Sequence, residues 1–129
     1  MDTHRYALKV KLNKLERESV FIQALLCDLL KKRGQEYELV DGYCTVYGSS
    51  CYHVWLEDKH GNQVDIIRIL FKEFDVPGFA LTKEFIKDAQ KDQLTVDLFE
   101  LYKKDKKEFW KKASKKFLEF KSKCLMSTK

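Results

Sequence analysis

The stretch CYHVWLEDKHGNQVD, residues 51–65, decides the fold, because it contains two short β-strands and the turn that joins them. Its first half is rich in residues that favour strands, where side chains point alternately to two faces. Gly61 suits the left-handed position that ends a three-residue hairpin loop. Such a loop pairs Trp55 with Asp65. His53 and Asp65 then share one face as diagonal neighbours, about 7 to 8 Å apart along the backbone.

The pairing of His53 with Asp65 is the feature that would carry chemistry. A carboxylate on one imidazole nitrogen fixes the tautomer, turns the other nitrogen toward a substrate or nucleophile, and stabilises the imidazolium that forms during acyl transfer. Alone, the pair also fits a purely structural hydrogen bond. The face on which Asp65 lies depends strictly on the loop length, because a loop that differs by one residue would put Asp65 on the opposite face. The sequence therefore predicts a His53–Asp65 contact that the strand register tests.

The residues before this hairpin predict a strand and a central helix. Apolar residues recur at every second position in residues 6–12, a period typical of a strand, although a short helix is compatible with the same residues. From about residue 16 to residue 33 the apolar residues follow helical spacing and cover most of the helix circumference. Basic residues precede Gly34, as at many helix C-termini. We expect this helix to be buried.

The remaining segments predict a small sheet followed by helices. Three segments rich in β-branched and aromatic residues predict an antiparallel meander: residues 36–47, 51–57 and 62–70. A turn is expected at Pro77 and Gly78, and helical patterns follow at residues 82–90 and 95–124. The predicted fold class is therefore α+β, with a central buried helix packed on a small antiparallel β-meander and with C-terminal helices.

Composition places the whole chain, residues 1–129, in a single domain. The sequence is 44% hydrophobic and 13% aromatic, which suffices for one core, and it contains one proline and five glycines. No apolar run approaches the roughly 20 residues that span a bilayer, and the N-terminus lacks an apolar signal segment. We expect a cytoplasmic protein with no membrane contact and no cofactor. Its four cysteines are then expected to be reduced thiols.

Charge is distributed unevenly along the chain. Residues 103–129 hold eleven lysines against three acidic residues, a net charge of +8, whereas the whole chain carries +5. The first 102 residues therefore carry −3, the difference between these two values. Lysine doublets recur through residues 95–129, which we interpret as a basic amphipathic C-terminal helix and tail. These lysines fit a solvated helix face, and contact with nucleic-acid phosphates is the alternative.

The order of these elements is similar to that of a known family. A mostly apolar helix ends at glycine, a strand carries Gly-Tyr at 42–43, the next strand reads His-Val-Trp-Leu-Glu at 53–57, and a short turn leads to Asp65. Over residues 19–67 this order resembles the transglutaminase-like branch of the papain-fold cysteine peptidases. The resemblance implies a papain-like core. It also implies a hydrolase or acyl transferase that acts on amide bonds, peptide or isopeptide, in a protein or peptide substrate.

Ser19 stands where that superfamily places its nucleophilic cysteine, at the start of the helix and four turns before Gly34. The resemblance implies Ser19 as the nucleophile, His53 as general base and acid, and Asp65 as the orienting carboxylate. Asn13, six residues before Ser19, matches the position of an oxyanion donor.

Serine at this position leaves three explanations open. Ser19 acts as a serine nucleophile, without a resting ion pair because a hydroxyl is far less acidic than a thiol. Alternatively, the domain has lost catalysis and is a pseudoenzyme or protein-interaction module, or serine replaces a native cysteine. Structural interpretations also fit the same residues, since Ser19 suits a helix cap and Asn13 suits a turn.

Cys27 and Cys51 are alternative candidates for the nucleophile. Cys27 lies in the apolar part of the predicted helix, which favours a core residue. Cys51 shares a strand face with His53, so its thiol lies within reach of the surroundings of the imidazole. A strand offers no helix dipole to stabilise a thiolate, and strand packing is therefore the favoured interpretation of Cys51.

A zinc site would combine four residues of suitable type: Cys44, Cys51, His53 and His60. A three-residue loop at residues 48–50 would pair Cys44 with Val54. Cys44 would then face away from the other candidate ligands. We therefore expect no metal site.

Overall fold

The computed structural model describes residues 3–46, 48–66 and 80–126, and side chains within residues 17–45, 48–66 and 80–124. Its helices are α1 (Thr3–Lys32), α3 (Gln93–Lys104), α4 (Lys106–Lys111) and α5 (Lys115–Met126). Its strands are β1 (Tyr37–Val46), β2 (Ser49–Asp58), β3 (Gln63–Val64) and β4 (Ala80–Thr82). The strands form one antiparallel sheet in the order β3-β2-β1-β4, so the predicted α+β class is confirmed.

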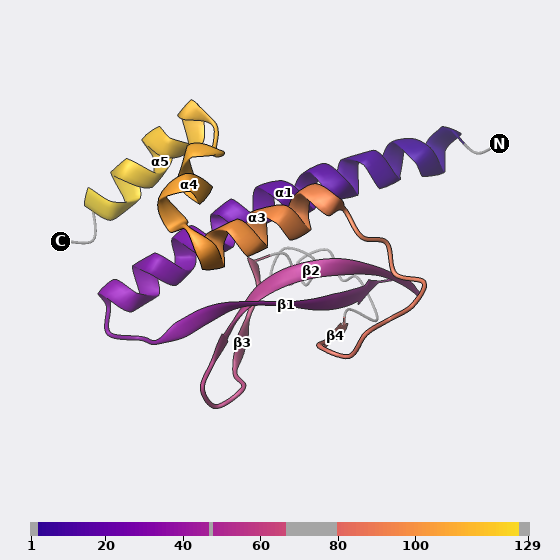
Figure 1. Cartoon of the computed structure of the whole chain (residues 1–129), viewed down its shortest axis with the longest axis horizontal. Helices are drawn as coiled ribbons and strands as arrows, with labels where there is room; N and C mark the ends of the chain where they lie inside the picture. Colours follow the sequence, from indigo (N-terminus) through magenta and orange to yellow (C-terminus); the bar gives the residue numbers. More distant parts are fainter. Residues whose placement is uncertain (1–2, 47, 67–79, 127–129) are drawn as a thin grey trace.

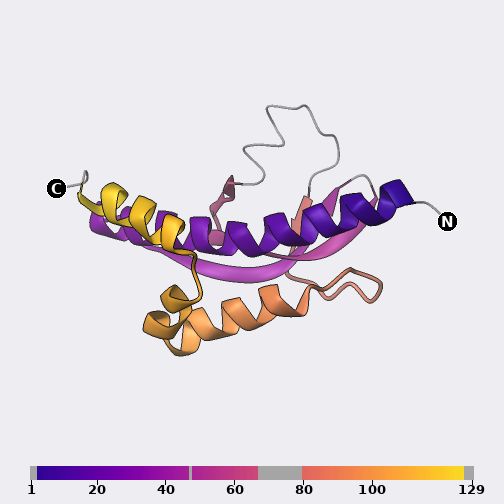
Figure 2. The ribbon, with the colours of Figure 1, turned by 90° about the horizontal axis from the view of Figure 1, so that it is seen from above.

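The helices lie on one side of the strongly curved β1–β2 hairpin. Figure 1 shows α1 and α3 side by side along the hairpin, and Figure 2 shows α5 beside the C-terminal half of α1. Ring contacts join these parts, since the centroids of Phe21 on α1 and Phe117 on α5 are 5.9 Å apart. None of the described helices is both long enough and apolar enough to cross a membrane.

Helix α1 is longer than predicted, and the strand prediction for residues 6–12 is wrong. Neither glycine nor proline occurs before Gly34, and leucines at positions 8, 12 and 15 also suit a helical period. Nothing local therefore stops the helix short of Thr3. The predicted C-terminus is confirmed: Gly34 has a φ of 80°, and two backbone hydrogen bonds of 3.0 and 2.9 Å form a Schellman motif around it.

The β1–β2 hairpin differs from the prediction in its turn. Val46 pairs with Ser49, so two residues connect the strands instead of the three predicted at residues 48–50. Cys44 consequently pairs with Cys51, not with Val54. Because the side-chain period of a strand is two, this shift moves Cys44 to the face that carries Cys51.

The β2–β3 hairpin has the predicted register. Leu56 pairs with Val64, and Gly61 ends the turn with a φ of 82°. The strand predicted at residues 62–70 is much shorter, because β3 ends at Val64. Residues 67–70 lie outside the described part of the chain.

Hydrogen bonds to Asp58 hold this second turn. Its carboxylate accepts the backbone N–H groups of His60 and Asn62, each at 2.9 Å. A further hydrogen bond from the Asn62 side chain, with these backbone bonds, lowers the pKa of Asp58. The turn geometry is therefore specified by residues within the turn itself.

Strand β4 was not predicted, and the helix predicted at residues 82–90 is wrong. Residues 80–82 pair with β1, which adds an edge strand to the sheet. The following residues form turns and bends up to Gln90, whose backbone bonds to β2. The turn predicted at Pro77 and Gly78 lies outside the described residues.

The single helix predicted at residues 95–124 is divided into α3, α4 and α5. Asp105 is extended, and its side chain accepts the backbone N–H three residues later at 3.2 Å. The Ser114 hydroxyl likewise accepts the backbone N–H three residues later, at 3.1 Å. Short polar side chains of this kind cap helix N-termini, so each of them starts a new helix. Between residues 95 and 126 the basic segment is therefore helical with two breaks, and residues 127–129 lie outside the described part.

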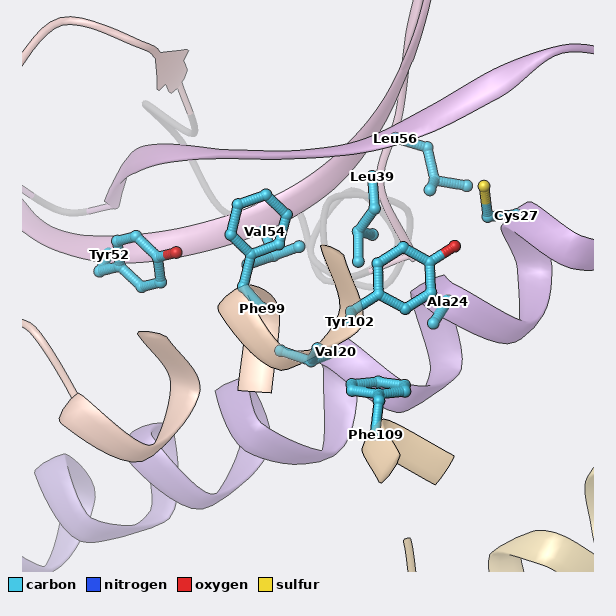
Figure 3. Close-up of a cluster of buried hydrophobic side chains, with 10 residues drawn as sticks. All are labelled: Val20, Ala24, Cys27, Leu39, Tyr52, Val54, Leu56, Phe99, Tyr102 and Phe109. Atoms are coloured by element: carbon cyan, nitrogen blue, oxygen red, sulfur yellow. The ribbon is translucent and has the colours of Figure 1, made fainter. Parts of the chain in front are cut away.

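The core lies between the hairpin and helices α1 and α3, as Figure 3 shows. Val54 and Leu56 extend from β2 toward α1, and Phe99 and Tyr102 approach from α3. Cys27 is a core residue, as predicted, and is fully buried. Burial raises the pKa of the Cys27 thiol, which keeps it protonated and unreactive.

An ion pair joins α1 to the start of α3. Two nitrogens of the Arg17 guanidinium donate to the two carboxylate oxygens of Asp92, at 2.7 and 2.9 Å. The hydrogen bond from Arg17 lowers the pKa of Asp92 and so favours its charged form. This contact fixes where α3 begins against α1.

The other face of β2 carries His53 and Trp55, and Gly42 makes room for the Trp55 ring. Gly42 pairs with His53 on the neighbouring strand. A Cβ atom at Gly42 would lie 2.5 Å from a Trp55 ring carbon and 2.5 Å from the Thr82 carbonyl oxygen. Glycine is required here because of this close approach.

We predict that Gly42→Ala destabilises the protein by about 1 to 3 kcal/mol, because the added methyl group overpacks the space between Trp55 and β4. Gly34→Ala is the control, since a Cβ there meets open space and only the left-handed backbone is strained. Its expected cost is about 1 kcal/mol. Urea unfolding of both variants measures the difference. A Gly42→Ala protein as stable as the wild type would contradict this packing.

Candidate functional site

The structure brings His53 and Asp65 together. His53 lies on β2 and Asp65 directly follows β3, so the turn at Gly61 sets their relative position. Nε2 of His53 is 2.6 Å from Oδ2 of Asp65, and neither side chain is exposed. The predicted contact is confirmed. Because an ionised carboxylate only accepts hydrogen bonds, this geometry assigns the hydrogen to Nε2.

Gln23 on α1 holds the second oxygen of the Asp65 carboxylate. Its side-chain nitrogen donates to Oδ1 of Asp65 at 3.3 Å and also to the Val54 carbonyl oxygen. Its side-chain oxygen accepts the backbone N–H of Ile66 at 3.3 Å. With one oxygen on His53 and the other on Gln23, the carboxylate is oriented from both sides.

The Gln23 carboxamide takes the place of a strand at the outer edge of β2. In the register of β3, Ile66 would pair with Val54 if the strand continued. The carboxamide bridges these two backbones instead. Farther along the same edge, the Gln90 backbone forms hydrogen bonds of 2.7 and 2.9 Å with β2. Buried backbone groups of the edge are thus satisfied without a full neighbouring strand.

Ser19 lies on α1 one turn before Gln23 and is fully buried. Helix α1 and strand β2 run in the same direction, as Figure 1 shows. Gln23 contacts Val54, and Cys27, one turn later, lies beside the far end of the hairpin. One turn before Gln23 therefore corresponds to the part of β2 that precedes Val54, where His53 lies. Ser19 therefore lies on the same face of α1 as Gln23, whose carboxamide contacts Asp65.

The electrostatic environment of Ser19 is not the one expected. Helix α1 begins at Thr3, so Ser19 lies about four turns inside the helix. The helix dipole acts within the first turn and does not assist ionisation of a side chain at this depth. The capping interpretation is also wrong, because Ser19 lies in the helix interior. Any activation of its hydroxyl has to come from the side chains around it.

The other candidate residues are placed as follows. Asn13 lies within α1 and not in a turn, and its side chain is outside the described residues. Cys44 and Cys51 lie on the face of His53, which corrects the expectation that Cys44 faces away. His60 lies in the exposed turn. Among the described residues, no group of three or more His, Cys, Asp or Glu side chains could hold a metal ion.

Gln23 is the site residue that sequence reasoning missed. It interrupts an otherwise apolar helix and stands four residues after Ser19, so both side chains lie on the same helix face. A polar residue on the buried face of a helix has to find a partner, which is a signal for a polar site. The identity of that partner depends on the packing of α1 against the sheet, which the sequence does not encode locally.

We predict that Gln23→Met destabilises the protein by about 2 to 3 kcal/mol, because it leaves a buried carbonyl and a buried carboxylate oxygen without their donor. Methionine has a similar length, so the change removes polarity more than volume. Gln90→Met is the matched control, since the exposed Gln90 bonds to β2 through its backbone. Chemical unfolding of both variants checks the difference, and equal stability of the two would contradict the role of Gln23.

No protein-family model, curated protein or solved structure matches the chain. The resemblance to transglutaminase-like domains therefore depends on residues 19–67 and stays a prediction.

Proposed function

We propose that this protein is an amide-bond hydrolase or acyl transferase of the transglutaminase-like kind, with Ser19, His53 and Asp65 as its catalytic triad. The observation that carries the proposal is the buried contact of 2.6 Å between His53 Nε2 and Asp65 Oδ2. A carboxylate that holds one nitrogen of a histidine is the orienting half of such a triad. A protein or peptide is the proposed substrate.

Each member of the triad has a defined role. Asp65 accepts the hydrogen of Nε2, so Nδ1 of His53 is the nitrogen that takes the proton of the Ser19 hydroxyl. The serine oxygen attacks the amide carbonyl, and Asp65 stabilises the imidazolium. Nδ1 then gives its proton to the departing amine, which leaves an acyl ester on Ser19. Water or a second amine resolves the ester, with His53 again as the base.

The triad is buried, so catalysis requires a movement that admits the substrate. Ser19 and His53 are 0% exposed and Asp65 is 3% exposed. A substrate reaches these groups only after surrounding segments move, as active-site loops do in other enzymes. The same burial favours a second candidate, a catalytically inactive pseudoenzyme that acts as a protein-interaction module. In that case the contacts among Gln23, His53 and Asp65 serve only to join α1 to the sheet.

The lysine-rich C-terminal segment gives less support to nucleic-acid binding. Three of its lysines lie over aromatic rings, at 5.4, 5.0 and 3.5 Å from the ring centroids: Lys103 over Phe99, Lys106 over Tyr102 and Lys121 over Trp110. In these contacts the lysine side chains cover aromatic rings of the same segment. They support the interpretation of these lysines as a solvated helix face.

The triad is tested by Ser19→Cys. If His53 acts on position 19, the introduced thiol is expected to react with iodoacetamide at neutral pH on the order of 10-fold faster than the same thiol in a His53→Gln background, because an adjacent imidazolium favours the thiolate. Burial of position 19 slows both reactions, so the ratio of the two rates isolates the effect of His53. The additional substitution His53→Ala is expected to abolish this gain. Peptide-resolved mass spectrometry follows position 19 separately from the four native cysteines.

Two controls accompany this test. Ser122→Cys places a thiol on the exposed part of α5, where its reactivity is expected to be indifferent to His53. His53→Gln retains an N–H donor for Asp65 and guards against misfolding of the alanine variant. A thiol at position 19 whose reaction rate does not respond to substitution of His53 would reject the triad and leave the interaction module.

A further inference from the structure

The hairpin places two cysteines directly opposite each other. Cys44 on β1 pairs with Cys51 on β2, so both side chains leave the sheet on the same face. On the next rung toward the turn, which points to the opposite face, Thr45 Oγ1 and Ser50 Oγ are 2.8 Å apart. Both cysteines are thiols in the structure.

The Cα spacing expected between these cysteines lies within the range of disulfides. Ser50 and Tyr52 direct backbone groups outward to Gln90. Backbone groups alternate in direction along a strand, so the N–H and C=O groups of Cys51 point toward β1. Cys51 therefore forms a hydrogen-bonded pair with Cys44. Such pairs hold their Cα atoms about 5.5 Å apart. Disulfides span Cα distances of roughly 4.4 to 6.8 Å, which includes this spacing. Their Cβ atoms lie about 3.5 to 4.5 Å apart, closer than in most hydrogen-bonded pairs, so the two strands have to approach by about 1 Å when the bridge forms.

We propose that Cys44 and Cys51 form a reversible dithiol–disulfide site whose oxidant is a small disulfide such as glutathione disulfide. Cys51 is partly exposed, whereas Cys44 is 2% exposed, so Cys51 reacts first. Its thiolate attacks glutathione disulfide, which forms a mixed disulfide and releases one glutathione thiolate. The Cys44 thiol loses its proton to solvent and attacks the Cys51 sulfur, and the second glutathione leaves. Two protein thiols are oxidised while one glutathione disulfide is reduced to two glutathiones.

The disulfide would lie beside the candidate site without belonging to it. Cys51 and His53 share a face of β2, and Gly42, two residues before Cys44, pairs with His53. The bridge would therefore hold β1 and β2 together next to the Gly42–His53 pair. Its formation requires no catalysis by Ser19, so the inference stands or falls independently of the proposed function.

The test equilibrates the full chain at micromolar concentration with mixtures of glutathione and glutathione disulfide. Remaining thiols are alkylated in acid and denaturant, and chymotrypsin then cuts after Tyr47, between the two cysteines. We expect a pair of peptides joined through Cys44 and Cys51, and an intact protein lighter by two hydrogens. Excess glutathione is expected to reverse both changes completely.

Single substitutions make the order of events visible. Cys44→Ser is expected to leave glutathione on Cys51, because no second thiol can displace it. Cys51→Ser is expected to leave Cys44 unmodified, since Cys44 is buried. Glutathione that stays on Cys51 of the wild-type protein beside an unoxidised Cys44 would overturn the proposal. A disulfide from Cys51 to Cys124 or to a second chain would overturn it as well.

Discussion

The tight turn between β2 and β3 is the constraint on which the site depends. Asp58 accepts two backbone N–H groups of the turn, and Gly61 adopts a left-handed conformation that other residues resist. The length of this turn determines which face of the sheet each following side chain occupies. A turn of different parity would direct the Asp65 carboxylate to the face of Val54 and Leu56, where an unpaired charge in an apolar core is very unfavourable.

The buried polar groups then depend on one another. Asp65 orients His53, Gln23 orients Asp65, and the same carboxamide connects the backbones of β2 and the residue after β3. A network of this kind is stable when each member is satisfied, and loss of one member leaves the others buried without partners. It ties α1 to the sheet, so the position of Ser19 follows from the same contacts. Gln23 and Asp65 therefore have a structural role in addition to their place in the proposed site.

Local signals account for what the sequence predicts correctly. The Gly61 turn and the Gly34 helix end depend on residues close in sequence, and both are confirmed. The errors arise where a local pattern has two solutions: residues 6–12 fit a strand period but form helix, and one residue in the β1–β2 turn changes the partner of Cys44. Strand β4 and the Gln23 contacts depend on packing between distant segments, which no local pattern contains. The breaks at Asp105 and Ser114 did carry a local signal, because both residue types favour helix N-termini.

The most direct measurement of the central claim is the tautomer and protonation of the His53 ring, read from its two nitrogen chemical shifts by NMR in the wild-type protein and in Asp65→Asn. With the carboxylate on Nε2, we predict that the Nε2 resonance is that of a protonated nitrogen, and that its hydrogen is strongly deshielded and protected from solvent exchange. Asp65→Asn is predicted to shift that hydrogen upfield. A neutral ring that carries its hydrogen on Nδ1, or an Nε2 hydrogen indifferent to Asp65, would contradict the arrangement of the site.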